Sequence, residues 1–327
     1  MRAAAGEIRI ASRLGSNDER SLAYDALDGL TRPFKELPPK HLYDAEGSRL
    51  FEAITEQPEY YQTRTERSIL AQHAADLVAA TNAAELAELG SGVPTKTRVL
   101  LDAMRDAGTL DRYLPMDVSE DVLRASAEKL VEEYPGLRVH GLVGDFERHL
   151  GALPPPEGPR MVAFLGGTIG NFLPGSRRRF MRAVGDGLRP QDRLLLGVDL
   201  VKDPAVLEAA YNDAAGVTAA FNRNVLAVLN RELHADFDLA AFEHVAFYDR
   251  QRQWIEMRLR ALEPQVVRVR DIGLTVHFAH REELRTEISA KFTRARLEAD
   301  LGASRLRLDR FMTDPHDLFA VALIARA

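Results

Sequence analysis

Residues 87–92 read AELGSG and are followed at once by VPTKT (93–97). An apolar run of strand length that ends in two glycines, Gly90 and Gly92, is typical of a strand-to-helix turn that holds a nucleotide. Glycine at such a turn lets a ligand lie directly against the backbone, because it has no side chain. A plain tight turn explains the same residues equally well. The stretch therefore raises the question of which nucleotide is bound.

The composition is that of an ordinary globular protein. The 327 residues are 46% hydrophobic and 28% charged, and this length predicts one large domain with a second, smaller unit. A formal net charge of -6 leaves no basic field for nucleic acid phosphates. The absence of cysteine excludes disulfides, thiolate metal sites and a cysteine nucleophile. Without a signal peptide pattern or an apolar run of membrane-spanning length, we expect a cytoplasmic protein with no membrane or nucleic acid partner.

Strands and helices alternate between about residues 65 and 200. Helical periodicity marks RSILAQHAADLVAAT (67–81) and TRVLLDAMRDAG (97–108). Short apolar runs predict strands at Glu85–Leu89, RYLPMDV (112–118), LRVHGLVGDF (137–146), RMVAFLGGT (160–168) and DRLLLGVDLV (192–201). This alternation predicts an α/β fold, a Rossmann-like parallel sheet with helices on both faces.

The pattern changes after Val201. A long helical stretch is expected over residues 203–233, and strand-like runs follow at 253–262, 264–278 and 286–292. We interpret this part as an α+β insertion, because the chain ends on one more strand, DLFAVALIARA (317–327), that completes the first sheet. The stretches LPPKHLYDAEGSRLF (37–51) and PEYYQTRTE (58–66) fit neither half clearly.

The residues around Gly90 and Gly92 discriminate between nucleotides. The third glycine of a dinucleotide fingerprint is missing, which argues against a nicotinamide oxidoreductase, and the Gly-Lys-Ser/Thr of a P-loop is missing too. What remains is Glu-x-Gly-x-Gly, with Glu88 at the strand end, and it resembles the first motif of S-adenosylmethionine-dependent methyltransferases. That cofactor carries no phosphate, so Gly90, Ser91 and Gly92 are expected to let it lie on bare backbone.

Two aspartates extend this motif to the next two strands. Asp117 ends the second strand, where a carboxylate can accept both ribose hydroxyls, and Asp145 follows the third, beside Phe146, where it can bind the adenine amino group. Ligands of doubly wound sheets bind at these strand ends. Either aspartate can instead cap the helix that follows it. Lys96 is a candidate partner of the cofactor's carboxylate, and a solvated surface lysine is the alternative.

Long strings outside these motifs are also informative: LPPKHLYDAEGSRLF, PEYYQTRTE, FLGGTIGNF, LLLGVDLVKD, YNDAAGVTAAFNRNVLAVLNREL, IEMRLRA and TEISAKF. With ELGSG, they resemble the histidine-specific Nα-methyltransferases of ergothioneine biosynthesis. The resemblance implies transfer of three methyl groups from S-adenosylmethionine to the α-amino nitrogen of L-histidine, giving hercynine. It also implies a class I methyltransferase domain over residues 64–200 and 291–327, and a substrate-binding domain over residues 15–63 and 201–290.

The resemblance assigns the residues around the substrate's amino acid group. Asn171 and Tyr211 match ligands of its carboxylate and amine, and Tyr43 and Tyr60 match tyrosines that border it. Tyr43, Tyr60 and Asn171 are therefore the expected catalytic residues. From the residues alone, Asn171 after Gly170 can equally be a left-handed turn residue, and the tyrosines can be half-buried packing residues.

The imidazole is assigned to one strand and its surroundings. Glu287 and Ser289 match the pair that reads the ring, and Met257 matches a side chain that packs on it. Period two places Glu287, Ser289 and Lys291 on one face, where a carboxylate and a hydroxyl can bond to two ring nitrogens. The solvated face of an amphipathic strand is the alternative reading of this pattern.

The loop LGGTIGN (165–171) is implied to touch both ligands. In the resemblance, Gly166 contacts cofactor and substrate, and Thr168 contacts the cofactor. The chain departs from the family at Gly167, where a serine is expected, and at Ala290, where cysteine is common. Neither departure falls on an assigned residue.

The remaining expectations concern metals and rival functions. The nine histidines include no HExxH and no close cluster beyond HFAH (277–280), so no metal site is expected. We expect a monomer that uses S-adenosylmethionine as co-substrate. A methyltransferase for another amino acid or small amine is one alternative. An inactive S-adenosylmethionine-binding sensor or scaffold is the other, and the presence of Asn171, Tyr211, Glu287 and Ser289 argues against it.

Overall fold

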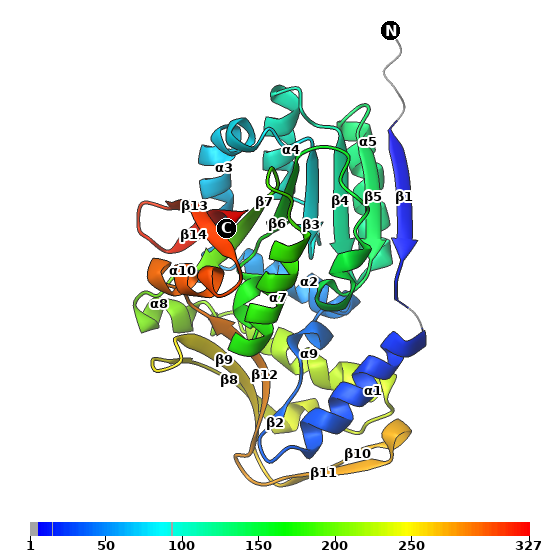
Figure 1. Cartoon of the computed structure of the whole chain (residues 1–327). Coiled ribbons are helices and arrows are strands. Elements are labelled where there is room, and N and C mark those ends of the chain that lie inside the picture. The colour runs from blue at the N-terminus through cyan, green and yellow to red at the C-terminus, as the bar shows by residue number, and fades with distance from the viewer. Residues whose placement is uncertain (1–5, 15, 93) are drawn as a thin grey trace. The chain divides into compact units, whose positions relative to one another are not determined.

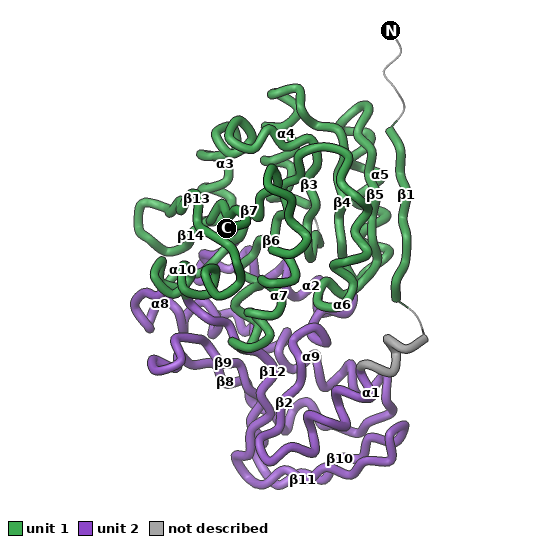
Figure 2. The backbone as a smooth tube through the Cα atoms, viewed as in Figure 1, with its two compact units in different colours: residues 1–15, 64–200, 292–327 green, residues 16–63, 201–291 purple. Residues whose placement is uncertain are grey.

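The computed structural model describes residues 6–14, 16–92 and 94–327, and of residues 16–21 the backbone alone. The chain forms two compact units, which Figure 2 colours separately. Unit 1 consists of Met1–Gly15, Arg64–Leu200 and Phe292–Ala327, and unit 2 of Ser16–Thr63 and Val201–Lys291. The domain boundaries expected from the sequence stay a prediction, in which Gly15 is outside the described residues. The functional role of each domain stays a prediction.

Unit 1 contains an eight-stranded sheet. Its strands are β1 (Glu7–Ser12), β3 (Glu85–Leu89), β4 (Arg112–Asp117), β5 (Arg138–Val143), β6 (Arg160–Phe164), β7 (Arg193–Asp199), β13 (Leu306–Thr313) and β14 (Phe319–Arg326). They lie in the order β1-β5-β4-β3-β6-β7-β14-β13. The first six of this order are mutually parallel, and β14 and β13 are antiparallel to their neighbours. The predicted α/β fold with a parallel sheet is confirmed.

Helices cover both faces of this sheet (Figure 1). The helices α3 (Gln62–Thr81), α4 (Thr97–Asp106) and α5 (Glu120–Glu133) share one apolar core with the strands. On the opposite face lie α7 (Pro174–Gly187) and α10 (Arg294–Gly302). Alternate residues of β6 divide between the faces, since Met161 and Ala163 join the α3–α5 core while Phe164 packs 4.9 Å from the ring of Phe180 on α7.

Local sequence explains where these elements begin. Ser119 caps α5, Thr293 caps α10, and Pro174 occupies the first position of α7. All residues of β3 are buried, as expected for a central parallel strand covered on both faces. Because β3 lies between β4 and β6, the chain order reverses at this strand, and ligands of such sheets bind at its carboxyl end.

Neither edge strand, β1 or β13, is predicted from the sequence. β1 pairs in parallel with β5, and β13 pairs with β14 across a register shift between Leu308 and Arg310. Both strands are only partly buried. A half-exposed edge strand has a weak alternation of apolar and polar residues, which explains why it gives little signal.

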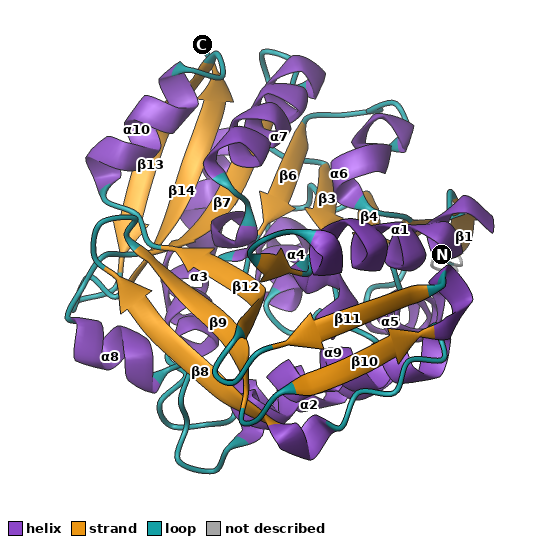
Figure 3. Cartoon of the chain, turned by 90° about the horizontal axis from the view of Figure 1, so that it is seen from below, coloured by secondary structure: helices purple, strands orange, loops and turns teal. Residues whose placement is uncertain are grey.

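Among its described residues, unit 2 contains a four-stranded sheet, a separate hairpin, four α-helices and three short 3-10 helices. Figure 3 shows these elements coloured by type. The sheet has the order β2-β12-β9-β8, and β10 and β11 form the hairpin. Helix α9 packs against α2, with Phe221 and Phe51 6.0 Å apart, and contacts β8 and β9. The elements are α1 (Ser16–Thr31), β2 (Lys35–Glu36), η1 (Pro39–Leu42), α2 (Ala45–Thr55), α8 (Pro204–Ala209), α9 (Val217–Glu232), η4 (Leu239–Ala241), β8 (Phe242–Asp249), β9 (Trp254–Ala261), β10 (Gln265–Val269), η5 (Arg270–Ile272), β11 (Leu274–Phe278) and β12 (Glu283–Ala290).

The prediction of one long helix over residues 203–233 is wrong. This stretch forms α8 and α9, separated by residues 210–216. Gly216 takes the left-handed conformation with a φ of 72°, which a continuous helix cannot contain. The Asp213 carboxylate then caps α9 by accepting from the backbone N–H groups of Val217 and Thr218, both at 2.7 Å. The break places Tyr211 on a connection instead of a helix face.

A buried ion cluster joins the first residues of three central strands. Glu85 begins β3, and its register partners Arg112 and Arg160 begin β4 and β6. The Glu85 carboxylate accepts from Arg112 at 2.6 Å and from Arg160 at 2.8 Å. Their side chains are 0%, 2% and 7% exposed, so one buried carboxylate pairs with two buried guanidinium groups.

Replacing Glu85 by Gln should destabilise unit 1 by about 3–5 kcal/mol, because it removes the carboxylate that pairs with the buried Arg160 and leaves Arg112 with the exposed Glu157 alone. The free energy of unfolding in urea, followed by circular dichroism, measures the loss. Glu157→Gln is the matched control, since Glu157 also pairs with Arg112 but is 50% exposed. The control should change stability far less, because solvent screens the exposed Glu157 carboxylate. Equal losses in the two variants would contradict the role given to Glu85.

Candidate active site

The turn after β3 brings Gly92 and Asp117 together. Gly90 and Gly92 have positive φ angles of 70° and 47°, a conformation that favours glycine. The backbone N–H of Gly92 donates to Oδ2 of Asp117 at 2.9 Å, and that of Ser119 donates to Oδ1 at 3.1 Å. The carboxylate at the end of β4 is thus fixed beside the glycine turn. It retains lone pairs for two further donors, as a ribose requires.

Asp117 and Asp145, the two aspartates predicted to bind the cofactor, differ in whether they also cap a helix. Asp145 accepts from the backbone N–H of Glu147 at 2.8 Å and caps α6 (Phe146–His149), so the capping alternative holds for this residue. It does not hold for Asp117, because Ser119 is the N-cap of α5. Contact of either carboxylate with a cofactor stays a prediction.

Phe146 borders the glycine turn. A methyl group placed on Gly90 would lie 3.5 Å from the Phe146 ring. The ring packs edge-on against Phe164, with centroids 5.2 Å apart, and also contacts Phe172 and Phe180. These four aromatic residues make an apolar region beside the turn, which suits a flat ring such as adenine.

Glu88 points into the protein. Its Oε2 accepts from the hydroxyl groups of Thr97 at 2.6 Å and Tyr113 at 2.5 Å, and the residue is buried. Burial raises the pKa of this carboxyl to about 7. Glu88 therefore ties β3 to the start of α4 and to β4. The neighbouring Ser91 is buried between the glycines.

Glu66 is a site residue that the sequence analysis missed. Its carboxylate is fully buried, accepts from the Lys96 ammonium at 2.5 Å, and accepts from the backbone N–H of Gly166 at 2.8 Å. Any side chain at position 197 would collide with it, since a methyl group on Gly197 would lie 1.9 Å from Glu66 Oε1. Lys96 is thus a paired lysine rather than a solvated one. The only sequence signal of Glu66 is its place in PEYYQTRTE.

The loop after β6 folds into the short helix η3 (Thr168–Asn171). Gly166 and Gly167 have positive φ angles of 79° and 70°, whereas Asn171 does not, so the left-handed turn alternative for Asn171 is wrong. Thr168 donates to the carbonyl of Leu165 at 3.0 Å. The side-chain amide of Asn171 has no hydrogen-bond partner among the described residues and is half-buried. Its contact with a substrate stays a prediction.

In unit 2, the pairing of β12 with β9 sets which side chains share a face. Glu287 pairs with Met257 and Ser289 with Ile255, so these four side chains lie on one face of the antiparallel pair. A β-bulge between Arg285 and Glu287 makes Thr286 an extra residue. The bulge reverses the alternation, and Arg285, two residues before Glu287, pairs with Arg258 on the opposite face.

Three polar side chains form a buried triangle beside Glu287. Tyr211 Oη donates to Ser289 Oγ at 2.8 Å, and Lys291 Nζ donates to Ser289 Oγ at 2.9 Å and to Tyr211 Oη at 3.0 Å. Lys291 is fully buried. Burial raises the pKa of Glu287 to about 7, while the positive charge of Lys291 opposes that rise. We call Tyr211, Met257, Glu287, Ser289 and Lys291 the Glu287 cluster.

Tyr43 and Tyr60 belong to a group of aromatic side chains next to this cluster. The Tyr43 ring packs edge-on against Phe51 and Phe221, at 5.5 Å and 5.4 Å, and Tyr60 lies 6.1 Å from Phe51. Burial, with the negative charge of Glu287, raises the pKa of the Tyr43 hydroxyl well above its ordinary value. Tyr43 is therefore a neutral phenol at physiological pH.

A second polar network of unit 2 supports the cluster and was also missed. Asn222 Nδ2 lies 2.8 Å from His244 Nδ1, and His244 Nε2 lies 2.9 Å from the carbonyl of Tyr211. Thr286 donates to Asn222 Oδ1 at 2.5 Å. The amide donates to Nδ1, so His244 carries its proton on Nε2 and is neutral, and burial lowers its pKa. The network joins Tyr211 to the bulge at Thr286.

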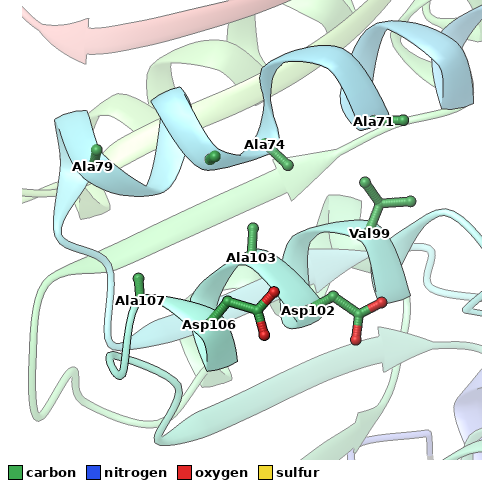
Figure 4. A pocket seen from close by; sticks show the side chains of 9 residues that line it. Ala71, Ala74, Ala79, Val99, Asp102, Ala103, Asp106 and Ala107 are labelled. Carbon is green, nitrogen blue, oxygen red and sulfur yellow. The ribbon is translucent and has the colours of Figure 1, made fainter.

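A groove of about 520 Å³ lies between α3 and α4, away from these residues (Figure 4). Its walls are mostly alanine methyl groups, and Asp102 at its edge is already bonded to Tyr134 at 3.0 Å and Arg105 at 2.9 Å. We interpret it as the outer surface of a helix contact. The lining residues are Ala71, Ala74, Ala75, Ala79, Val99, Asp102, Ala103, Asp106 and Ala107.

Within residues 6–14, 16–92 and 94–327, no group of three or more His, Asp or Glu side chains is arranged to hold a metal ion. None of the described helices is both long enough and apolar enough to cross a membrane.

Comparison with known proteins shows the family to which the chain belongs. Residues 22–326 match the family model described as histidine-specific, S-adenosylmethionine-dependent methyltransferase. The chain is 53% identical over 306 residues to histidine N-alpha-methyltransferase of Mycolicibacterium smegmatis, covering 94% of this chain and 95% of the relative. It is 48% identical over 320 residues to the protein of that name from Mycobacterium tuberculosis, covering 98% and 99%. Ergothioneine biosynthesis protein 1 of Neurospora crassa is 36% identical over 196 residues, which are 59% of this chain and 22% of that protein.

These matches identify the chain as an S-adenosylmethionine-dependent methyltransferase. More narrowly, the chain belongs to the histidine-specific methyltransferase family. The resemblance stated from the sequence is thereby confirmed.

Asp117→Ala should weaken binding of S-adenosylhomocysteine by at least about a hundredfold. Two hydrogen bonds from the ribose to a charged acceptor are worth roughly 1.5–3 kcal/mol each. The variant also removes the hydrogen bond from the Gly92 backbone N–H to the Asp117 carboxylate. Isothermal titration calorimetry measures the affinity. Asp121→Ala, which removes an exposed carboxylate at the start of α5, is the control and should bind normally. Unchanged affinity in Asp117→Ala would remove Asp117 from the cofactor site.

Proposed function

We propose that the protein transfers methyl groups from S-adenosylmethionine to the α-amino nitrogen of L-histidine, three times in succession, to give hercynine for ergothioneine biosynthesis. The observation that carries the proposal is the Glu287 cluster, in which a carboxylate and a hydroxyl lie on one face of β12 opposite Met257. A neutral imidazole can donate its N–H to the carboxylate and accept from the hydroxyl at its other ring nitrogen. The names of the M. smegmatis and N. crassa relatives support the same substrate and pathway.

The residues of unit 1 suit S-adenosylmethionine. Asp117 would accept from the ribose, Asp145 and Phe146 would bind the adenine, and the glycine turn leaves room for both. Lys96, positioned by Glu66, would meet the cofactor's carboxylate, and Gly166 and Thr168 would line the same strand end. When bound, the cofactor supplies an electrophilic methyl group on a sulfonium.

The protein has to present a neutral nitrogen lone pair in line with that methyl group. Each transfer forms a nitrogen–carbon bond, breaks a carbon–sulfur bond, and needs the amine to have given up a proton. Tyr43 is a neutral phenol, so it can orient the amine through its hydroxyl but cannot act as a phenolate base at physiological pH. We therefore assign Tyr43, Tyr60 and Asn171 to positioning, which is the main source of acceleration in such a displacement.

Three successive transfers need fixed anchors away from the nitrogen. In the proposal, Asn171 holds the carboxylate and Glu287 and Ser289 hold the imidazole, while Tyr211 faces the amine with its remaining lone pair. The nitrogen can then rotate and gain methyl groups between them. All these side chains belong to one chain, so we expect a monomer, acting in the cytoplasm without a metal ion.

Purified enzyme with excess S-adenosylmethionine should convert histidine to the trimethylated betaine, because each intermediate keeps both anchors. Mass spectrometry of the product at long reaction times tests this. A monomethyl end product, or methyl groups on a ring nitrogen, would contradict the proposal.

Glu287→Ala should lower kcat/KM for histidine by about ten- to a hundredfold, since a hydrogen bond to a charged group is worth roughly 1.5–3 kcal/mol. Phenylalanine should lose less or gain, because the buried carboxylate no longer lacks a partner when a ring without an N–H donor binds. Glu283→Ala is the matched control, since Glu283 lies on the same strand but pairs with Arg260 on the opposite face. The ratio of kcat/KM for histidine to that for phenylalanine should fall in Glu287→Ala alone. A wild-type ratio in that variant would mean that Glu287 does not read the imidazole.

A further inference from the structure

We propose that Lys291 is a positioning residue that fixes the direction of the Ser289 hydroxyl and places a positive charge on the face of β12 that carries Glu287, so that the Glu287 cluster selects a ring with one N–H donor and one lone pair. The proposal rests on the proposed function, since it takes histidine as the ligand of this cluster. It assigns a role to a fully buried cation to which the resemblance gives none.

The hydrogen bonds of Ser289 support the first part of the proposal, which concerns the direction of its hydroxyl. A hydroxyl has one hydrogen to donate and two lone pairs to accept with. Both lone pairs of Ser289 Oγ are engaged, by Tyr211 Oη at 2.8 Å and Lys291 Nζ at 2.9 Å. The hydrogen of Ser289 has no acceptor among the described residues. Ser289 can therefore meet a ligand only as a donor.

Lys291 also decides the direction of the bond between the two hydroxyls. An ammonium has three hydrogens and no lone pair, so it donates to both Ser289 and Tyr211. Tyr211 Oη, which accepts from Lys291 at 3.0 Å, keeps its own hydrogen for Ser289. A phenol is also the more acidic of the two hydroxyls and hence the better donor. Without the ammonium, both hydroxyl hydrogens could turn.

The charge of Lys291 supports the second part of the proposal, which concerns Glu287. A buried carboxyl tends to stay protonated, and a nearby cation opposes this. Among the described residues, the Tyr43 hydroxyl also faces Glu287, and as a neutral phenol it brings no positive charge. As a carboxylate, Glu287 is an acceptor only. The cluster thus presents one acceptor and one donor, which matches the neutral form of an imidazole and rejects rings with two donors or none.

The pH profile of kcat/KM for histidine tests the proposal, because it reports the ionisation of the free enzyme and the free substrate. Activity should fall as the pH drops through about 7, where Glu287 gains a proton. In Lys291→Met the midpoint of this fall should move upward by roughly one pH unit or more, because the cation that opposes protonation is gone. Glu287→Gln identifies the part of the profile that belongs to the substrate.

Two further variants separate charge from orientation. Lys291→Gln keeps an N–H donor without the charge, so it should show the upward shift even if Lys291→Met folds poorly. Combining Lys291→Met with Ser289→Ala tests orientation. If Lys291 acts through Ser289, the loss caused by Lys291→Met should be at least about threefold smaller in the Ser289→Ala background.

Lys202→Met is the matched control. Lys202 donates to Tyr61 Oη at 2.7 Å and lies 4.6 Å from that ring, a lysine–tyrosine contact of the same kind elsewhere in unit 2. Its pH midpoint should equal that of the wild type. Unshifted midpoints in both Lys291 variants, together with independent effects of Lys291→Met and Ser289→Ala, would overturn the inference. If wild-type enzyme does not methylate histidine in this assay, the proposed function itself fails.

Discussion

The buried Glu85 carboxylate fixes the register of the three central strands on which unit 1 depends. It bonds to Arg112 and Arg160 at the amino ends of β3, β4 and β6, where all three side chains are out of water. A slip of one residue would break these bonds and turn every side chain to the other face. At the carboxyl ends, the same register places Gly92 within 2.9 Å of Asp117. The charged end of the sheet thus determines the geometry of the end that binds ligands.

In unit 2 the comparable constraint is the bulge at Thr286. It puts Glu287 and Ser289 on the face of Met257 and sends Arg285 to the other side, where it pairs with Arg258. Thr286 donates to the fully buried Asn222, which also meets His244. Since His244 in turn meets the carbonyl of Tyr211, one polar network holds both sides of the Glu287 cluster. The geometry of the Glu287 cluster therefore depends on this backbone irregularity.

Local sequence patterns predict the secondary structure and which side chains share a strand face. Alternating apolar runs and helical periodicity predict the parallel sheet, and period two places Glu287 and Ser289 on one face, as the register confirms. Contacts between distant residues leave no such pattern, so Glu66, which meets Lys96 and Gly166, and the His244 network were missed. The helix over 203–233 was predicted as continuous because its residues favour helix, although Gly216 and the Asp213 cap end it locally.

The central claim is that one chain binds S-adenosylmethionine through unit 1 and recognises the imidazole of histidine through the Glu287 cluster. Calorimetric titration with S-adenosylhomocysteine, followed by histidine on the same sample, tests it most directly. The account predicts one binding event per chain for each ligand, with phenylalanine giving at most weak heat in place of histidine. Binding of S-adenosylhomocysteine without binding of histidine, or equal affinity for histidine and phenylalanine, would contradict it.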